Sequence, residues 1–273
     1  MQTILKKIRI RLSRLLRPAQ GEVWCLHRVV NIRSAKPSNR ELEITSDYLR
    51  QLILNKRNEG FRFVSMDGLV NDSHHSFTQK RIVMSFDDGF EDVYTNAFPI
   101  LRELNVPFTL FLTPAYINRD SYPWWLQLEN VFPEPDIYER ELKQLFDAPD
   151  DMQSHYEADY PHSKPEVMLT WTQIKEMIQS GLCTIGAHGL HHYSLQRIDS
   201  YLAQNELVES KKQIERHLGV KVLHMSYPNS EQNASVQQLV KEAGFLTAFI
   251  GFGGCVRRGD NLYCLYRQYI TQP

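Results

Sequence analysis

One segment of the chain, RIVMSFDDGFED at residues 81–92, combines the residue types that acid–base and metal chemistry need. An apolar run ends there in two adjacent carboxylates, Asp87 and Asp88, followed by Gly89. Such a run is typical of a parallel strand covered on both faces, and active sites collect where these strands end. Because successive strand residues point to opposite sides, one carboxylate can bind a cation while the other moves a proton. The alternative is a solvated Asp-Asp-Gly turn.

A second segment, LCTIGAHGLHHYSL at residues 182–195, places imidazoles at the end of another short apolar run. His188 and His192 are four positions apart, so a helical turn would bring them to one face, as in paired-histidine metal sites. Asp88 would complete a set of two histidines and one carboxylate, which leaves coordination positions open for water and substrate. A surface histidine cluster is the alternative, but the aspartate pair in the same chain favours a catalytic metal site.

These two segments resemble the signature motifs of the polysaccharide deacetylases, carbohydrate esterase family 4. The resemblance implies that Asp87 is the general base, that Asp88, His188 and His192 bind the metal, and that His191 is only a neighbour. Gly189 stands where the family usually has Ser or Thr, which removes a supporting hydroxyl but no ligand. The resemblance extends over roughly residues 22–270 and includes LTWTQIKEMIQSG before the histidines.

Tyr227-Pro228-Asn229 resembles the third motif of the family, in which a backbone NH just after the proline helps to hold the oxyanion. Here that NH would belong to Asn229, and such a donor can contribute about 3 kcal/mol to catalysis. The resemblance therefore implies an oxyanion and substrate site at these three residues.

The arginine that usually steadies the base in this family is missing, because Met225 and Ser226 occupy that neighbourhood. Arg267, in LYRQYI near the end of the chain, is the expected substitute, since barrel strands distant in sequence end beside one another. Pairing with arginine would also keep Asp87 ionised. The alternative is a surface arginine.

The general acid is also expected from an unusual place. The late Leu-x-x-His motif of the family is absent, since no histidine follows His224. His27, in CLHRV at the end of the first apolar run, fits a circularly permuted arrangement that resembles the poly-N-acetylglucosamine deacetylases, and an imidazole suits this role near neutral pH. A structural histidine is the alternative, and His224 is the reserve candidate, although its place inside a strand suggests the core.

Composition bounds the rest of the interpretation. A chain of 273 residues with 42% hydrophobic content can bury one large α/β core, and its net charge of -1 gives no argument for a nucleic-acid partner. Its four cysteines are widely spaced without a CxxC motif, so we expect reduced core residues and a reducing compartment.

The first twenty residues carry six basic side chains and no acid, with apolar residues at helical spacing. They predict a basic amphipathic helix without the features of a secretory signal or a transmembrane span. This helix either packs on the domain or lies on an anionic membrane through residues 1–18. We therefore expect a cytoplasmic protein, peripheral to the inner face of the membrane in the second case.

From residue 21 to residue 273, strand and helix signals alternate as one catalytic domain, which implies parallel strands with right-handed crossovers. A segment at about residues 119–165, rich in Pro, Asp and aromatics, is expected to be an insertion, either functional or a satellite core. The sequence predicts a distorted, incomplete (β/α) barrel of about seven parallel strands, which is also the fold that the resemblance implies. An open doubly wound sheet is the second choice.

The expected activity is metal-dependent removal of an acetyl group from an N-acetylated sugar or glycan, as in glycan biosynthesis. Zinc is the default ion, and iron, cobalt or nickel would also suit two histidines and a carboxylate. One alternative is hydrolysis of an amide in a small non-sugar substrate. Another is a glycan-binding protein that keeps the metal and has lost turnover, which the missing local arginine and late histidine favour and Asp87 opposes.

Overall fold

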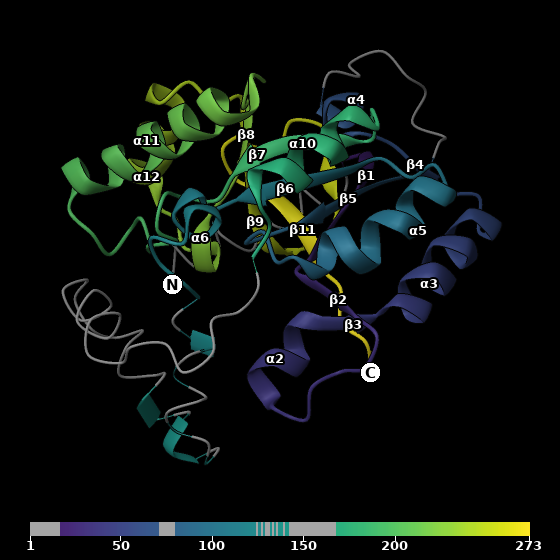
Figure 1. Ribbon diagram of the computed structural model, residues 1–273. Coiled ribbons are helices and arrows are strands. Elements are labelled where there is room, and N and C mark those ends of the chain that lie inside the picture. Colours follow the sequence, from purple (N-terminus) through teal and green to yellow (C-terminus); the bar gives the residue numbers. More distant parts are fainter. Residues whose placement is uncertain are drawn as a thin grey trace, which may run out of the picture.

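Seven parallel strands close into a barrel in the computed structural model of this chain, which describes residues 17–70, 80–123, 168–273 and scattered positions between 125 and 141. The first strand of the barrel pairs with both the second and the last, so the ring of seven strands is closed. The predicted barrel is therefore confirmed, and the open doubly wound sheet is wrong (Figure 1). Around the ring the strands are β1 (Ala19–Leu26), β5 (Arg81–Phe86), β6 (Phe108–Leu112), β7 (Cys183–Ala187), β8 (His224–Ser226), β9 (Thr247–Gly253) and β11 (Leu265–Tyr269).

Short strands extend this barrel on its outside. β4 (Arg62–Phe63) runs parallel to β5, and β10 (Val256–Arg257) runs antiparallel to β1. A separate small sheet pairs β2 (Arg28–Val30) with β3 (Glu43–Thr45) just beyond the end of β1. The sequence did not predict β2, β3 or β10, because strands of two or three residues carry no periodicity to detect.

Helices surround the barrel on its outer side (Figure 1). Side-chain caps fix several of their starts: Thr45 accepts from the Tyr48 NH, and Thr170 forms a reciprocal capping box with Gln173. Gly219 ends the longest helix with a left-handed φ of 68°. Their bounds are α2 (Pro37–Leu42), α3 (Ser46–Asn58), α4 (Met66–Val70), α5 (Phe98–Glu103), α6 (Pro114–Asn118), α10 (Trp171–Gln179), α11 (Ser200–Leu218) and α12 (Ala234–Glu242), with short turns η1 (Val93–Ala97) and η2 (Pro228–Ser230).

The helical segment that follows Asp92 is divided into two parts. Its first turn is the π-helical η1, and α5 begins only at Phe98. Pro99 has no NH to donate to the preceding turn, so the regular hydrogen-bond ladder cannot continue through it.

Alternate strand residues point into the barrel and divide its contents into two layers. The lower layer is an apolar cluster that includes Val23, Val83, Phe111, Phe249 and Leu265. Residues two positions further along several of these strands are polar, and they form an upper layer at the carboxyl ends. The alternation of strand residues thus places a layer of polar side chains directly above the apolar cluster.

Two predicted segments fall largely outside the description. Residues 1–16 of the predicted amino-terminal helix, and most of the insertion between residues 124 and 167, are not among the described residues. Both stay predictions. Among the described helices, none has the length and apolar character to cross a membrane.

Candidate metal and catalytic centre

Asp88, His188 and His192 meet at the carboxyl ends of β5 and β7. The Nε2 atoms of His188 and His192 each lie 3.4 Å from Oδ1 of Asp88. All three side chains are buried, and His188 is anchored because its backbone NH donates to the Leu112 carbonyl of β6 at 2.8 Å. The structure thus brings together the three residues that the sequence predicted as ligands.

The two histidines converge through an irregular loop, so the helical turn suggested by their spacing is wrong. Gly189 and His192 adopt left-handed φ angles of 76° and 66°, which fold the chain back toward Asp88. Glu206 of α11 secures this loop by accepting from the Leu190 and His191 NH groups, each at 2.9 Å. The carboxylate of Glu206 also contacts His191 Nδ1 at 2.6 Å, which turns that imidazole away from the three ligands.

Neighbouring groups also orient the two ligand rings. His188 Nδ1 donates to the Ser226 carbonyl at 2.8 Å, so its Nε2 lone pair faces Asp88. The ring of Trp125, from the described part of the insertion, lies 4.6 Å from the His192 ring, and Tyr116 stacks on the same ring at 6.1 Å. These aromatic rings hold His192 in place and shield the centre from solvent.

The donor set fits a divalent cation. Asp88 Oδ1 is buried without a hydrogen-bond partner, and burial, with the neighbouring Asp87 charge, raises the pKa of Asp88 well above its usual range. Burial lowers the pKa of both His188 and His192, which keeps them neutral, as ligands must be. Zinc bonds of about 2.0–2.1 Å at tetrahedral angles separate ligand atoms by about 3.4 Å, which matches the two observed distances.

Arg267 and Asp87 form a two-pronged ion pair inside the barrel. Arg267 Nη1 lies 2.7 Å from Asp87 Oδ1, and Nη2 lies 2.6 Å from Oδ2. The guanidinium also donates to the hydroxyls of Ser85 and Ser226 and to the Ile250 carbonyl. Arg267 is only 1% exposed, so the surface alternative for this arginine is wrong.

This pair decides the charge of Asp87. Burial alone would raise the pKa of Asp87, but the Arg267 charge, and then His188, outweigh burial and hold that pKa well below its usual range. Asp87 therefore stays ionised at neutral pH, while its Oδ2 lies 3.8 Å from Nε2 of His188. An ionised carboxylate beside a candidate metal ligand is placed to accept a proton from a water molecule at that site.

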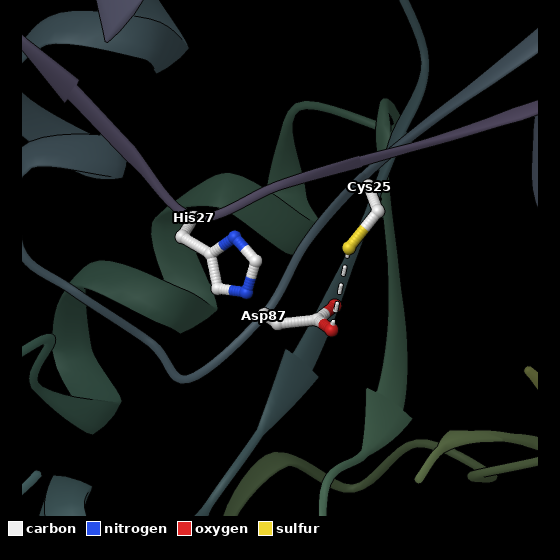
Figure 2. Close-up of side chains that lie close together, drawn as sticks. All are labelled: Cys25, His27 and Asp87. Carbon is white, nitrogen blue, oxygen red and sulfur yellow. Dashed lines mark hydrogen bonds between the residues drawn. The ribbon is translucent and has the colours of Figure 1, made fainter. Parts of the chain in front are cut away.

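His27 lies near Asp87, directly after β1, and Cys25 lies two residues before it (Figure 2). A nitrogen of His27, the Cys25 sulfur and an Asp87 oxygen all lie within 4.8 Å of one another. Burial lowers the pKa of His27 to about 4, although Asp87 opposes this shift. His27 is thus a neutral imidazole within reach of the base, and its ring packs against Tyr269 at 5.3 Å.

The segment Tyr227-Pro228-Asn229 directly follows β8 and leads into the turn η2, next to the histidine loop. A Cβ added at Gly189 would lie 3.4 Å from the Pro228 ring, so the two segments touch. Asn229 has a left-handed φ of 55°, and its side-chain Nδ2 is buried without a hydrogen-bond partner. The Tyr227 hydroxyl instead donates to the Tyr263 carbonyl at 2.8 Å, so this side chain anchors the turn.

His224 is far from this chemistry. It begins β8, at the opposite end of the barrel, where it contacts the Thr247 hydroxyl at 2.7 Å and Asp67 at 3.2 Å. It is therefore a buried structural histidine, and the reserve role given to it as general acid is wrong.

Sequence reasoning missed four residues that shape the centre: Cys25, Ser85, Ser226 and Glu206. Each of the first three lies two positions from Val23, Asp87 or His224 on its strand. Since residues two apart in a strand point to the same side, the alternation of strand residues could have identified them as pointing into the barrel. Glu206 carried no comparable signal, because a charged residue in a long helix is normally expected to be solvated.

Comparisons with known proteins find similarity over most of the chain. Residues 74–248 match the family model described as polysaccharide deacetylase. YxkH of Bacillus subtilis (strain 168), provisionally named a polysaccharide deacetylase, is 21% identical over 194 residues, which cover 71% of this chain and 53% of YxkH. The poly-beta-1,6-N-acetyl-D-glucosamine N-deacetylase of Escherichia coli (strain K12) is 22% identical over 170 residues, 61% of this chain and 20% of that protein. The matches thus span about half of one curated relative and a fifth of the other.

Solved structures share the fold over nearly the whole chain. The Streptococcus pyogenes deacetylase PplD, solved in complex with acetate, superposes with a TM-score of 0.69 at 18% identity, covering 92% of both chains. IcaB from Ammonifex degensii superposes with a TM-score of 0.68 at 22% identity, covering 93% of both chains. These likenesses show the shared fold, and the family-model match over residues 74–248 shows that the chain belongs to the polysaccharide deacetylase family.

Proposed function

We propose that this protein is a metal-dependent hydrolase that removes the acetyl group from an N-acetylated amino sugar in a glycan. One observation carries the proposal: Asp87, held ionised by Arg267, lies directly beside the donor set of Asp88, His188 and His192. A proton acceptor beside an open cation site is the combination that amide hydrolysis by water requires.

Asp88, His188 and His192 would hold the ion, which supplies Lewis acidity by polarising the acetyl carbonyl and acidifying water. Asp87 accepts the proton of the attacking water. The Asn229 backbone NH is assigned to the developing oxyanion, where a donor can contribute about 3 kcal/mol. The left-handed turn at Asn229, fixed by the Tyr227 anchor, sets the direction of that NH.

The proton then has a short path to the leaving nitrogen. His27 is neutral in the free site because burial lowers its pKa to about 4, so it must gain a proton during the reaction. Asp87 holds that proton after water attacks, and the two side chains lie within 4.8 Å. His27 can therefore receive it and donate it to the departing amine, without which an amide nitrogen is a poor leaving group.

The relatives guide the choice of substrate. The named activity of the E. coli relative is deacetylation of poly-beta-1,6-N-acetyl-D-glucosamine, so short β-1,6-linked N-acetylglucosamine chains are the first substrates to test. The basic amino-terminal segment favours a glycan presented at a cytoplasmic membrane surface, such as a lipid-linked precursor.

An acetate-release assay tests the proposal. Metal-free protein should be inactive on these oligosaccharides, and one equivalent of zinc, cobalt, nickel or iron(II) should restore release of acetate with formation of an equal amount of free amine. Parallel assays with a lipid-linked N-acetyl sugar and a small aliphatic acetamide separate the substrate classes. Acetate release from the small amide alone would reject the glycan assignment and support the non-sugar alternative.

The structure weakens the binding-protein alternative. That alternative depended on a missing arginine beside the base, and Arg267 makes that contact from β11. It also depended on the missing late histidine, and the role proposed here for His27, which directly follows β1, would answer that objection.

A further inference from the structure

We propose that Cys25, His27 and Asp87 form a second cation site, weaker than the first, whose occupation by a thiophilic divalent metal inhibits the enzyme. The three donor atoms are a thiol, an imidazole nitrogen and a carboxylate oxygen, and all lie within 4.8 Å of one another (Figure 2). They are distinct from the ligands Asp88, His188 and His192. The inhibitory consequence rests on the proposed function, whereas the binding site itself does not.

The geometry of this cluster suits zinc or cobalt. Cys25 Sγ lies 3.7 Å from Asp87 Oδ2. Bonds of about 2.3 Å to sulfur and about 2.0–2.2 Å to oxygen at a tetrahedral angle would separate these atoms by about 3.6 Å. The thiol and carboxylate are thus already spaced for a shared ion, and a small rotation of the partly exposed His27 ring would add the third donor.

Arg267 makes this site weaker than the first. Its guanidinium contacts both oxygens of Asp87, so an incoming cation must take Oδ2 from Nη2 and accept a positive neighbour. The thiol of Cys25 must also release its proton to solvent on binding. By contrast, Asp88 Oδ1 has no hydrogen-bond partner to displace, so the first site should fill before the second.

The chemistry of the donors selects the metal. A thiolate with an imidazole and one carboxylate favours borderline and soft ions such as zinc, cobalt and cadmium over magnesium or manganese, which prefer oxygen ligands. A metal bound here occupies the Asp87 oxygen and the His27 nitrogen through which protons move. Activity should therefore rise with the first equivalent of zinc and fall with excess.

Cobalt binding tests the site without reference to activity. Metal-free protein titrated with Co²⁺ should bind two equivalents, and only the second should produce a sulfur-to-cobalt charge-transfer band. Cys25→Ser should bind one equivalent without that band, whereas Cys255→Ser, at a cysteine outside the barrel strands, should behave as wild type. A single equivalent in the wild type, or an unchanged band in Cys25→Ser, would overturn the proposal.

Excess zinc tests the functional consequence. Each protein's acetate release is normalised to its own value at one equivalent of zinc, so a lower basal rate does not matter. Because even a residue that supports a metal ligand is worth about 10–100-fold in affinity, Cys25→Ser should shift the inhibitory zinc concentration upward by at least about tenfold. An unshifted midpoint would remove Cys25 from the site. If no substrate is turned over, the cobalt titration still shows whether the second cation site exists. Failure of the proposed function can therefore be distinguished from failure of the proposed site.

Discussion

Arg267 of β11 holds Asp87 through both carboxylate oxygens, although the two residues are 180 positions apart in the chain. The closed barrel makes this contact, because β1 lies between β11 and β5 and brings their ends to one rim. A buried ion pair is stable only where its remaining hydrogen-bonding groups also have partners. Here two serine hydroxyls and a backbone carbonyl accept the other hydrogen bonds of the guanidinium. Arg267 therefore sets both the orientation and the charge of the proposed base.

Replacing Arg267 should change the pH dependence of the reaction. In Arg267→Gln, burial is no longer opposed by the adjacent positive charge, so the pKa of Asp87 rises and the ionised base is lost as pH falls. We expect a greater loss of kcat/KM at pH 5.5 than at pH 8, measured by acetate release. Arg267→Lys is the matched control, because it keeps the positive charge but loses the two-pronged contact with Asp87. Its loss of kcat/KM at pH 5.5 should be smaller than that of Arg267→Gln. Identical pH profiles for all three proteins would contradict this role.

The same pair should contribute to stability with a definite sign. A carboxyl whose folded pKa is depressed stabilises the fold above its unfolded pKa of about 3.9, and this contribution is lost as pH falls through the folded value. Removing one partner of a buried pair typically costs about 3–5 kcal/mol. Urea unfolding of Arg267→Gln at pH 7 should therefore show a lower free energy of unfolding, and folding of each variant must be checked before its rate is interpreted.

Asp87→Asn should retain the metal and lose turnover. The amide can still accept a hydrogen bond from Arg267, but it cannot accept a proton from water. Loss of a general base typically costs about 10²- to 10⁴-fold. Metal content by elemental analysis and acetate release are the two measurements. A rate within threefold of wild type would remove Asp87 from the mechanism.

The sequence predicted the barrel and the main residues of the centre because both leave local signals. An apolar run predicts a strand, and the DDG or HGLHH that follows it marks the carboxyl end of that strand. The contact between Arg267 and Asp87 was expected only through the predicted barrel, because no local pattern in the sequence distinguishes a closed barrel from the open sheet that was the second choice. The sequence also predicted the wrong local conformation for the histidine loop, because two left-handed residues and the Glu206 carboxylate bring His188 and His192 together without a helix.

Metal content should distinguish two adjacent histidines. His192→Gln should lose the tightly bound ion, because its Nε2 is one of the three converging donors. His191→Gln should keep it, since His191 Nδ1 faces Glu206. Both proteins are loaded with one equivalent of zinc, dialysed and analysed for metal. Undiminished metal in His192→Gln would show that the wrong histidine was assigned.

The amino-terminal segment gives a prediction that the structure sharpens at one boundary. Arg17 donates to the Gly259 carbonyl at 2.6 Å, so a truncation should remove residues 1–16 and leave Arg17 in place. That deletion removes five of the six basic residues, each worth about 1 kcal/mol near an anionic surface and less in salt. The truncated protein should no longer sediment with anionic liposomes but should hydrolyse a soluble substrate normally. Full-length protein that ignores such liposomes at low salt would contradict membrane contact.

The identity of the general acid can be tested by an internal comparison of two substrates. His27 lies beside Asp87 at the end of β1, whereas His224 lies at the opposite end of the barrel. Protonation of the leaving group matters most for an amine, and little for an activated phenol, which departs unaided. His27→Gln should therefore lower deacetylation of an N-acetyl sugar by about 10²-fold or more while sparing hydrolysis of an activated acetyl ester and binding of the first metal.

The matched control for this comparison is His224→Gln, which should destabilise the fold without separating the two substrates. An equal loss on amide and ester in His27→Gln would indicate that the ring supports the metal or the fold rather than the leaving group. No loss on either substrate would leave water to protonate the amine. Selective loss on the amide alone, with bound metal unchanged, is the result that the position of His27 beside the base predicts.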